Sequence, residues 1–256
     1  MRLSVVIPAH NEEECIERVV LDLERALGDA AVPHETVVVD DNSTDRTGAI
    51  LDALSGRLPS VRVAHRREAP GFGRAIRAGL AAMRGECCAI VMGDGSDDPA
   101  DVVLYYRKLM EGYDCVYGSR FIRGGVVKDY PRIKLWVNRL ANTFLRVLFW
   151  THHNDLTNAF KAFRTEVIRA IEPIQANHFN ITVEMSLKPL VRGAKIAVVP
   201  ISWYGRTAGV TKLRINVMGR KYLFTALYVW LEKHLIADEL AGWGDPRPRG
   251  GASERE

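Results

Sequence analysis

The sequence has few cysteines and no long apolar run. Its four cysteines show no CxxC spacing, and Cys87 and Cys88 stand in an apolar, strand-like stretch. This pattern argues against a zinc site or a disulfide framework and predicts reduced thiols in the core of a cytoplasmic protein. The longest strongly apolar run, residues 222–231, is about half of the ~20 residues that a membrane-spanning helix needs. We therefore expect no helix that crosses a bilayer.

An excess of one charge is also absent. The chain of 256 residues carries 35 Lys and Arg against 31 Asp and Glu, a formal net charge of +4. This mild balance does not predict binding to nucleic acid, although it suits an anionic ligand or a membrane surface. An apolar strand pattern begins at residue 3, so we expect no secretion signal before it. The ordinary content of hydrophobic residues, 47%, predicts one sizeable globular core.

Short β-rich runs alternate with amphipathic stretches in the first part of the chain. The runs are residues 3–7, 36–39, 61–64 and 89–92, and the stretches between them are 13–27, 47–58 and 74–83. This alternation predicts an α/β fold of right-handed βαβ units with a mostly parallel central sheet. The ligand site of such a sheet lies beyond the carboxyl ends of its strands. The loops that follow the strands are therefore the places to search for chemistry.

Acidic residues gather in two of those loops, DDNSTD at 40–45 and GDGSDDP at 93–99. In the second loop the carboxylates repel one another unless a hard divalent cation or a turn network compensates them. Asp98 precedes a proline and fits a helix cap, which leaves Asp94 and Asp97 as the predicted ligands of Mg²⁺ or Mn²⁺. The alternative is that the whole loop is a turn that caps the next helix.

The first acidic loop offers two roles. Asp45 fits the N-terminus of the following helix, where a carboxylate stabilises exposed N–H groups. Asp40 and Asp41 stand directly at the end of the predicted strand, where a carboxylate accepts from a base or a ribose hydroxyl. A nucleotide contact and a purely structural one are about equally supported by this loop alone, and the second acidic loop favours the nucleotide.

Three segments resemble the inverting family 2 glycosyltransferases of the GT-A fold: VVIPAHNE at 5–12, VVDDNSTD at 38–45 and GSR at 118–120. Within that family the chain is most similar to the branch of dolichol-phosphate mannose synthases and polyprenyl-phosphate glycosyltransferases, over residues 3–213. Matches further along are DLTNAFK at 155–161, residues 179–184 and RTAGVTKL at 206–213. The resemblance implies metal-dependent transfer of mannose or glucose from a GDP- or UDP-hexose to a polyprenyl or dolichyl phosphate, with inversion.

The resemblance also implies roles for individual residues. It places Pro8 and Glu12 near the base, Asp40 beside the nucleoside and Arg120 near the sugar or the acceptor phosphate. The position of the other candidates along the chain adds His10, Asp41 and Asp94 to the donor contacts, and it adds Asp97 and Asp155 to Arg120 as candidate catalytic residues. His10 stands where the branch commonly has Tyr. The metal motif departs from the usual Asp-x-Asp-x-Gln, since Gly93, Gly95 and Asp97 occupy those places. Asp97 matches the position of a ligand, and we expect Asp94 to substitute from a shifted backbone.

The chemistry of the sugar acceptor decides which further residue types the site needs. A lipid phosphate with a second pKa of about 6 is mostly dianionic at neutral pH and needs cations rather than a strong base. The candidates for that role are Arg120, Lys161, Arg206 and Lys212. If the acceptor is instead a saccharide hydroxyl, Asp155 becomes the candidate base, because an alcohol loses its proton during attack. A third alternative is a module that binds nucleotide sugar without catalysis.

Two segments mix basic and aromatic residues in the manner of helices at a membrane surface, 132–150 and 212–235. Helices that pack on the sheet with extended Arg and Lys side chains are the alternative. We expect peripheral contact with the cytoplasmic face of a membrane. The expected organisation is a glycosyltransferase domain at 1–213, an amphipathic helix at 214–241 and a disordered tail at 242–256.

Overall fold

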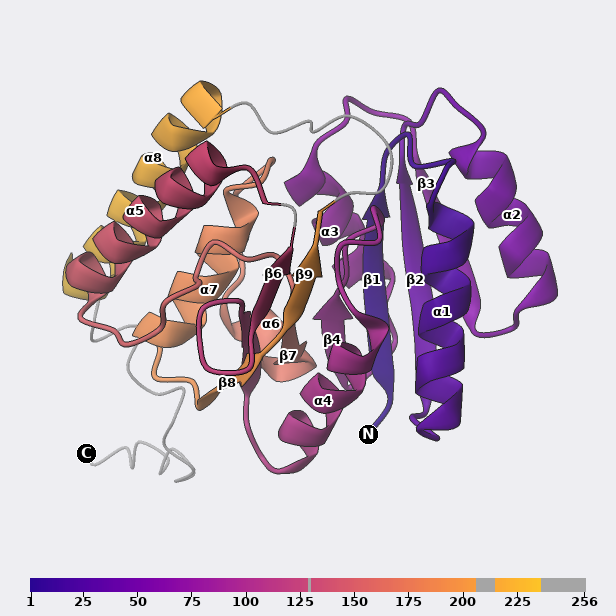
Figure 1. Cartoon of the computed structure of the whole chain (residues 1–256), viewed down its shortest axis with the longest axis horizontal. Helices are drawn as coiled ribbons and strands as arrows, with labels where there is room; N and C mark the ends of the chain where they lie inside the picture. Colours follow the sequence, from indigo (N-terminus) through magenta and orange to yellow (C-terminus); the bar gives the residue numbers. More distant parts are fainter. Residues whose placement is uncertain (129, 206–214, 236–256) are drawn as a thin grey trace, which may run out of the picture.

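A seven-stranded sheet forms the centre of the protein, and a two-stranded sheet lies beside it (Figure 1). The computed structural model describes residues 1–128, 130–205 and 215–235. The large sheet contains β1 (Leu3–Ala9), β2 (His34–Asp41), β3 (Val61–Arg66), β4 (Cys87–Ile90), β5 (Cys115–Ser119), β7 (Lys161–Arg164) and β8 (Ile196–Pro200). The small sheet pairs β6 (Val126–Lys128) with β9 (Ser202–Tyr204).

Helices cover both faces of the large sheet. One face packs against α1 (Ile16–Asp29), α2 (Thr47–Arg57) and α4 (Pro99–Met110). The other packs against α3 (Phe72–Ala82), α5 (Arg132–Phe149), α6 (Thr165–Ala170), α7 (Ile181–Val191) and α8 (Ile215–Leu235). β1 shows how the sequence creates two cores: Val5 joins the first and Val6 the second, because successive side chains on a strand point to opposite faces.

The strand order β3-β2-β1-β4-β7-β5-β8 places a switch point between β1 and β4. The chain passes from β1 outward to β2 and β3, all parallel, and then returns to the other side of β1 to form β4. Loops leaving two neighbouring strands in opposite directions open a crevice at the carboxyl edge, which is where ligands bind in open α/β sheets. The acidic loop after β4 therefore borders the crevice.

Strand β7 is antiparallel to both of its neighbours, β4 and β5. Its first residue, Lys161, pairs with Ile90 near the end of β4 and with Tyr117 near the end of β5. Because β7 runs against its neighbours, the segment that leads into it arrives at the carboxyl edge of the sheet. This topology brings residues 154–160 beside the loop that leaves β5.

The predicted α/β pattern of the first part of the chain is confirmed, with shifted boundaries. The fourth strand, expected at 89–92, is found two residues earlier, at Cys87–Ile90. Met92 already belongs to the acidic loop, because its N–H donates to the Asp97 carboxylate at 2.9 Å. The four cysteines are free and buried, as expected. None of the described helices is long and apolar enough to cross a membrane.

Candidate active site at the carboxyl edge of the sheet

The loop after β1 is fixed to the loop after β2 by short polar contacts. The Asn11 N–H donates to Ser43 Oγ at 3.1 Å, and Asn11 Oδ1 accepts from the Thr44 N–H at 2.8 Å. The Glu12 N–H donates to Thr47 Oγ1 at 2.8 Å. Asn11 adopts a positive φ of 51°, a conformation that Asn tolerates better than most residues. These contacts place the predicted donor residues on one rigid rim of the crevice.

Asp40, at the end of β2, is buried and held by two donors. Its Oδ1 accepts from the Ser43 N–H at 3.1 Å, and its Oδ2 lies 2.9 Å from His65 Nδ1. Burial raises the pKa of this carboxyl, but the hydrogen bonds from Ser43 and His65 outweigh it and hold the pKa below its ordinary value. Asp40 is thus a stable carboxylate at the crevice, as a ribose or base contact requires.

Asp41 has a more structural set of partners. Its Oδ1 is paired with Arg66, and its Oδ2 accepts from the Gly71 N–H at 2.6 Å, at the start of α3. The carbonyl of Asp41 lies 2.8 Å from Nδ1 of His10, which links the β1 and β2 loops. Pro8 is buried in β1 beside them. The structure brings these predicted donor residues together, while Arg66 and Gly71 are partners that sequence reasoning missed.

Asp97 is a carboxylate of the site with an oxygen that accepts no hydrogen bond from the part of the chain that the structure describes. Its Oδ2 accepts from the Met92 N–H at 2.9 Å, whereas its Oδ1 is buried with no hydrogen-bond partner among the described residues. The residue is 7% exposed. Burial raises the pKa of this carboxyl to about 7; the neighbouring Asp94 adds to the rise, and Arg120 opposes it. A buried carboxyl oxygen without a donor is the arrangement that a bound cation would complete.

The other acidic residues of this loop have turn and cap contacts. Asp94 Oδ1 accepts from the Ser96 N–H at 3.1 Å, across Gly95, whose φ of +72° closes the turn. Asp98 caps α4, accepting from the Ala100 N–H at 2.9 Å, as expected for the residue before Pro99. The turn and the helix cap therefore account for the carboxylates of Asp94 and Asp98, whereas they leave one oxygen of Asp97 without a hydrogen bond from any described residue.

A ready-made cage is absent: the described residues contain no group of three or more His, Cys, Asp or Glu side chains arranged to hold a metal ion. Mg²⁺ is commonly bound by one or two carboxylates together with the phosphates of a substrate, so a cage is not required. The open oxygen of Asp97, with Asp94 beside it, fits that mode. The residues present therefore fit Mg²⁺ or Mn²⁺, and the metal site at Asp94 and Asp97 stays a prediction.

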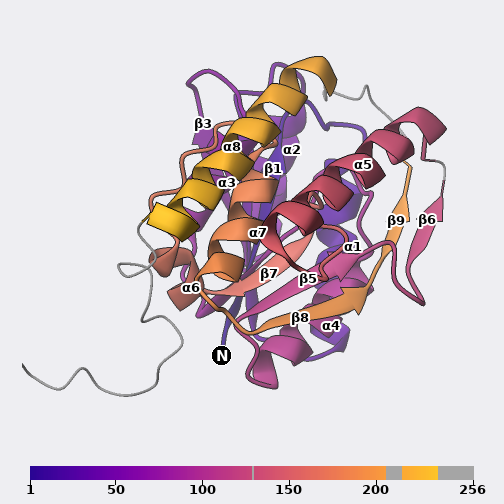
Figure 2. The ribbon, with the colours of Figure 1, turned by 90° about the vertical axis from the view of Figure 1, so that its left-hand side faces the viewer.

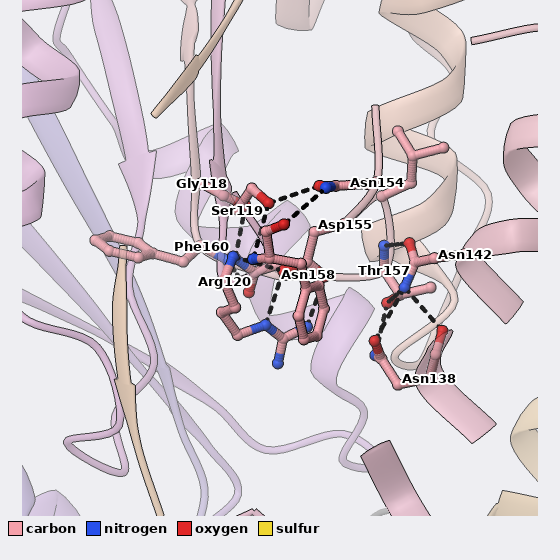
Figure 3. A network of polar contacts seen from close by, with 12 residues as sticks. Gly118, Ser119, Arg120, Asn138, Asn142, Asn154, Asp155, Thr157, Asn158 and Phe160 are labelled. Atoms are coloured by element: carbon pink, nitrogen blue, oxygen red, sulfur yellow. Dashed lines mark hydrogen bonds and ion pairs between the residues drawn. The ribbon is translucent and has the colours of Figure 1, made fainter. Parts of the chain in front are cut away.

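Arg120, after β5, and Asp155, before β7, form a buried ion pair at the carboxyl edge of the sheet (Figure 3). Arg120 donates from Nε to Oδ2 at 2.8 Å, from Nη2 to Oδ1 at 2.7 Å, and from its backbone N–H to Oδ2 at 3.1 Å. The pair raises the pKa of the guanidinium against the effect of burial. Both oxygens of Asp155 are engaged by Arg120, which suits a residue that positions a cation. The predicted role of Asp155 as a base stays a prediction.

Aromatic rings surround the Arg120 guanidinium. Its carbon lies 5.3 Å from the centre of the Phe121 ring and 5.8 Å from that of Tyr130, distances typical of cation–π contacts. Tyr130 in turn packs on Trp203 of β9, with ring centres 4.8 Å apart. The backbone of Trp203 also forms an isolated antiparallel β-bridge with Asp97, so β9 contacts the acidic loop as well as Tyr130.

The loop before β7 is held by polar side chains that sequence reasoning missed. Asn154 Oδ1 accepts from Ser119 Oγ at 2.6 Å, and Asn158 Nδ2 donates to the Gly118 carbonyl at 3.1 Å. Two asparagines of α5, Asn138 and Asn142, donate to Thr157 Oγ1. Their four-residue spacing on the inner face of an amphipathic helix was the available signal.

Lys161 lies behind this loop rather than in the crevice. The residue is 1% exposed, and its ammonium donates to the carbonyls of Leu156 and Asn158 and lies 5.4 Å from the centre of the Tyr117 ring. Burial lowers the pKa of this amine to about 7. These contacts anchor the loop and do not support the predicted contact with an acceptor phosphate. The other two predicted phosphate contacts, Arg206 and Lys212, lie outside the described residues.

Residues 4–172 match the model of the family described as "Glycosyl transferase family 2". Among curated proteins, the chain is 31% identical to polyprenol monophosphomannose synthase of Mycolicibacterium smegmatis, over 83% of this chain and 81% of the relative. It is also 31% identical to undecaprenyl-phosphate mannosyltransferase of Micrococcus luteus, over 86% of this chain and 90% of the relative.

Solved structures share the architecture. Glucosyl-3-phosphoglycerate synthase from Mycobacterium tuberculosis, crystallised with Mn²⁺, UDP and phosphoglyceric acid, superposes with a TM-score of 0.68. The match covers 90% of this chain and 78% of that one, at 24% identity. This likeness confirms the predicted GT-A-type fold.

Proposed function

The chain belongs to glycosyl transferase family 2, and from this membership we propose that it transfers a hexose from a nucleotide sugar to a polyprenyl phosphate, with inversion. The relatives are named as mannose-transferring proteins, so mannose is the first sugar to test, from GDP-mannose, with UDP-glucose as the second donor. The observation that carries the proposal is the buried Oδ1 of Asp97, which has no hydrogen-bond partner among the described residues, near the buried guanidinium of Arg120 that Asp155 holds.

On this proposal the rim formed by the β1 and β2 loops holds the nucleoside, and the Asp40 carboxylate accepts a hydrogen bond from its base or ribose. Asp97, assisted by Asp94, would hold the divalent cation. Bound there, Mg²⁺ or Mn²⁺ supplies positive charge for the departing nucleoside diphosphate. Arg120 adds a second positive charge near Asp97, held rigidly by Asp155. A preorganised cation is effective because it needs no rearrangement during the reaction.

The contacts of Asp155 favour a phosphate acceptor over a saccharide hydroxyl. A hydroxyl needs a base that receives its proton, and both oxygens of Asp155 are engaged by Arg120. A phosphate with a second pKa of about 6 attacks as a dianion and needs a cation near the attacking oxygen. Nη1 of Arg120 donates to no residue that the structure describes, and it is available to an anion.

The test is a transfer assay with radiolabelled GDP-mannose and UDP-glucose, undecaprenyl or dolichyl phosphate, and Mg²⁺ or Mn²⁺ against chelator. We expect metal-dependent label that extracts into organic solvent and is released by mild acid, as a sugar phosphodiester is. Asp98→Asn is the matched control for Asp97→Asn, since it changes the neighbouring carboxylate that caps a helix. Donor binding without any lipid label would reject the polyprenyl acceptor.

We also propose that the protein contacts a membrane through α5 and α8. The two helices lie side by side along one flank of the molecule (Figure 2). Large apolar side chains are exposed there: Ile133, Trp136, Val137, Leu140, Phe144, Val147 and Trp150 around α5, and Leu223, Phe224, Leu227, Leu231 and Leu235 on α8. Trp136 is 78% exposed, and contiguous patches of this kind mark interaction sites.

Cosedimentation with vesicles of phosphatidylglycerol and phosphatidylcholine tests this contact. Trp136→Ser combined with Leu140→Ser removes two exposed apolar side chains, each worth about 1.5–3 kcal/mol when fully buried. We expect the bound fraction to fall at least tenfold. Met110→Ser, an exposed apolar residue on α4, is the control and should bind as the wild type does. Equal binding of the α5 variant would contradict the contact.

A further inference from the structure

The helix with the exposed apolar flank also holds the loop of the candidate active site. Trp136 and Leu140 face outward on α5, whereas Asn142 is 1% exposed and faces inward. Asn138, one turn earlier, lies on the same inner side, where its amide reaches Thr157 (Figure 3). A single helix therefore has one apolar flank and one polar flank, and the polar flank contacts residues 154–157.

Thr157 is the point of attachment. Its Oγ1 accepts from Nδ2 of Asn142 and from Nδ2 of Asn138, both at 2.9 Å, and its N–H donates to Oδ1 of Asn142 at 3.3 Å. A third residue of α5, Arg139, donates from Nη1 to the Asn154 carbonyl at 3.3 Å. Both the backbone and the side chain of Thr157 are thus bound to α5, which fixes the loop more tightly than one contact would.

The position of this loop determines the position of Arg120 through Asp155. Asp155 stands two residues before Thr157, and its carboxylate accepts three hydrogen bonds from Arg120. The guanidinium has only one carboxylate to orient it among the described residues. A displacement of the loop would therefore displace Arg120, and with it the positive charge that the proposed reaction needs.

We propose that Asn142 and Thr157 are positioning residues for glycosyl transfer, which set the place of Arg120 through Asp155 and tie it to the helix that faces the membrane. This inference rests on the proposed function. A lipid phosphate stays at the depth of the bilayer surface, so a cation linked rigidly to the membrane-facing helix meets that phosphate at a fixed height. The small displacements that such a link prevents are costly, because misplacement by about 1 Å can slow a reaction ~100-fold.

The direct test compares Thr157→Val with Thr157→Ser. Valine keeps the shape but removes the oxygen that the two asparagine amides share, whereas serine keeps that oxygen. We expect Thr157→Val to lower kcat with polyprenyl phosphate about tenfold at unchanged affinity for the nucleoside diphosphate, and Thr157→Ser to restore at least half of the rate. Thr143→Val is the control, since the Thr143 hydroxyl donates to the Arg139 carbonyl of the same helix at 2.9 Å and to no other residue that the structure describes.

A double-mutant cycle separates positioning from general weakening of the fold. If Thr157 acts through Arg120, adding Thr157→Val to Arg120→Lys should reduce kcat by less than twofold, because the group being positioned has already been changed. If the loop contact serves only stability, the same tenfold loss should appear in both backgrounds. That second outcome would overturn the proposal.

Hydrogen exchange gives a readout that does not depend on the acceptor. In the free protein, Thr157→Val should raise exchange at the amides of residues 119–121 and 154–158, while Thr143→Val should leave them unchanged. Unchanged exchange in Thr157→Val would refute the positioning link even if transfer is found. Raised exchange in a protein that never labels polyprenyl phosphate would keep the link and reject the proposed function instead.

Discussion

Asp155→Asn is the substitution with the most informative consequence. It preserves the size of the side chain but removes its charge, and it turns one acceptor oxygen into an NH₂ group that faces the donors of Arg120. The pair is buried, with side chains 6% and 1% exposed, and two of its three hydrogen bonds join charged groups. Breaking a buried ion pair on one side costs about 3–5 kcal/mol, because a charge remains without a partner. Two charge-assisted hydrogen bonds at about 1.5–3 kcal/mol each give a similar magnitude.

Urea denaturation followed by tryptophan fluorescence measures this loss. With a slope of about 3 kcal/mol per molar urea, the midpoint should fall by roughly 1–1.7 M. The double variant Asp155→Asn/Arg120→Met removes the stranded charge as well. It should recover most of the stability, since replacing a whole buried pair with apolar groups is often neutral. Transfer to polyprenyl phosphate should be lost in both variants. The single variant no longer holds the Arg120 guanidinium in place, and the double variant lacks that guanidinium.

Two results would refute this reasoning. If Asp155→Asn unfolds within about 1 kcal/mol of the wild type, the pair is not desolvated in solution and the magnitude taken from buried pairs does not apply. If the double variant is less stable than the single one, the guanidinium is held mainly by its aromatic neighbours, Phe121 and Tyr130, rather than by the carboxylate.

Three further predictions test other parts of the structure. Asp97→Asn should lower the affinity for Mn²⁺, titrated calorimetrically with a nucleoside diphosphate present, at least about tenfold, and an unchanged affinity would remove this carboxylate from the site. His34, whose pKa is raised mainly by its hydrogen bond to Glu24, contributes stability when protonated. That contribution is complete below a pH of about 6.5 and is lost as the pH rises through the raised pKa. The unfolding free energy of the wild type should therefore exceed that of His34→Gln by more at about pH 5.5 than at about pH 8.5, and a pH-independent difference would contradict the pairing. Gly118→Ala should cost about 1–3 kcal/mol by denaturation, because a Cβ there overlaps the Tyr105 hydroxyl, and a loss below about 0.5 kcal/mol would show that the packing yields.

Local patterns in the sequence predicted one half of the fold well. The alternation of apolar runs and amphipathic stretches identified β1 to β4 and the helices between them, because each element buries its own periodic face. The short strands β6 and β9 escaped detection, since three residues carry no readable periodicity. β7 escaped for a different reason: its direction depends on its neighbours and not on its own four residues.

The candidate site divides in the same way. The sequence predicted the acidic loops and the cap at Asp98, because these features depend on neighbouring residues and on the strand just before them. It could not distinguish Asp97, with its unpaired oxygen, from Asp94, whose carboxylate closes a turn. It also predicted that Lys161 contacts the acceptor phosphate, although the folded chain buries that amine against two carbonyls.

What the sequence determined by itself was the family, the parallel half of the sheet and the edge at which the carboxylates collect. These follow from motifs and periodicities read over short distances along the chain. The tertiary structure alone decided which charges meet, because Arg120 and Asp155 are joined only when β7 runs antiparallel beside β5. It also decided that the polar flank of α5 holds the loop of Asp155, a contact between segments 15 residues apart that only packing brings together.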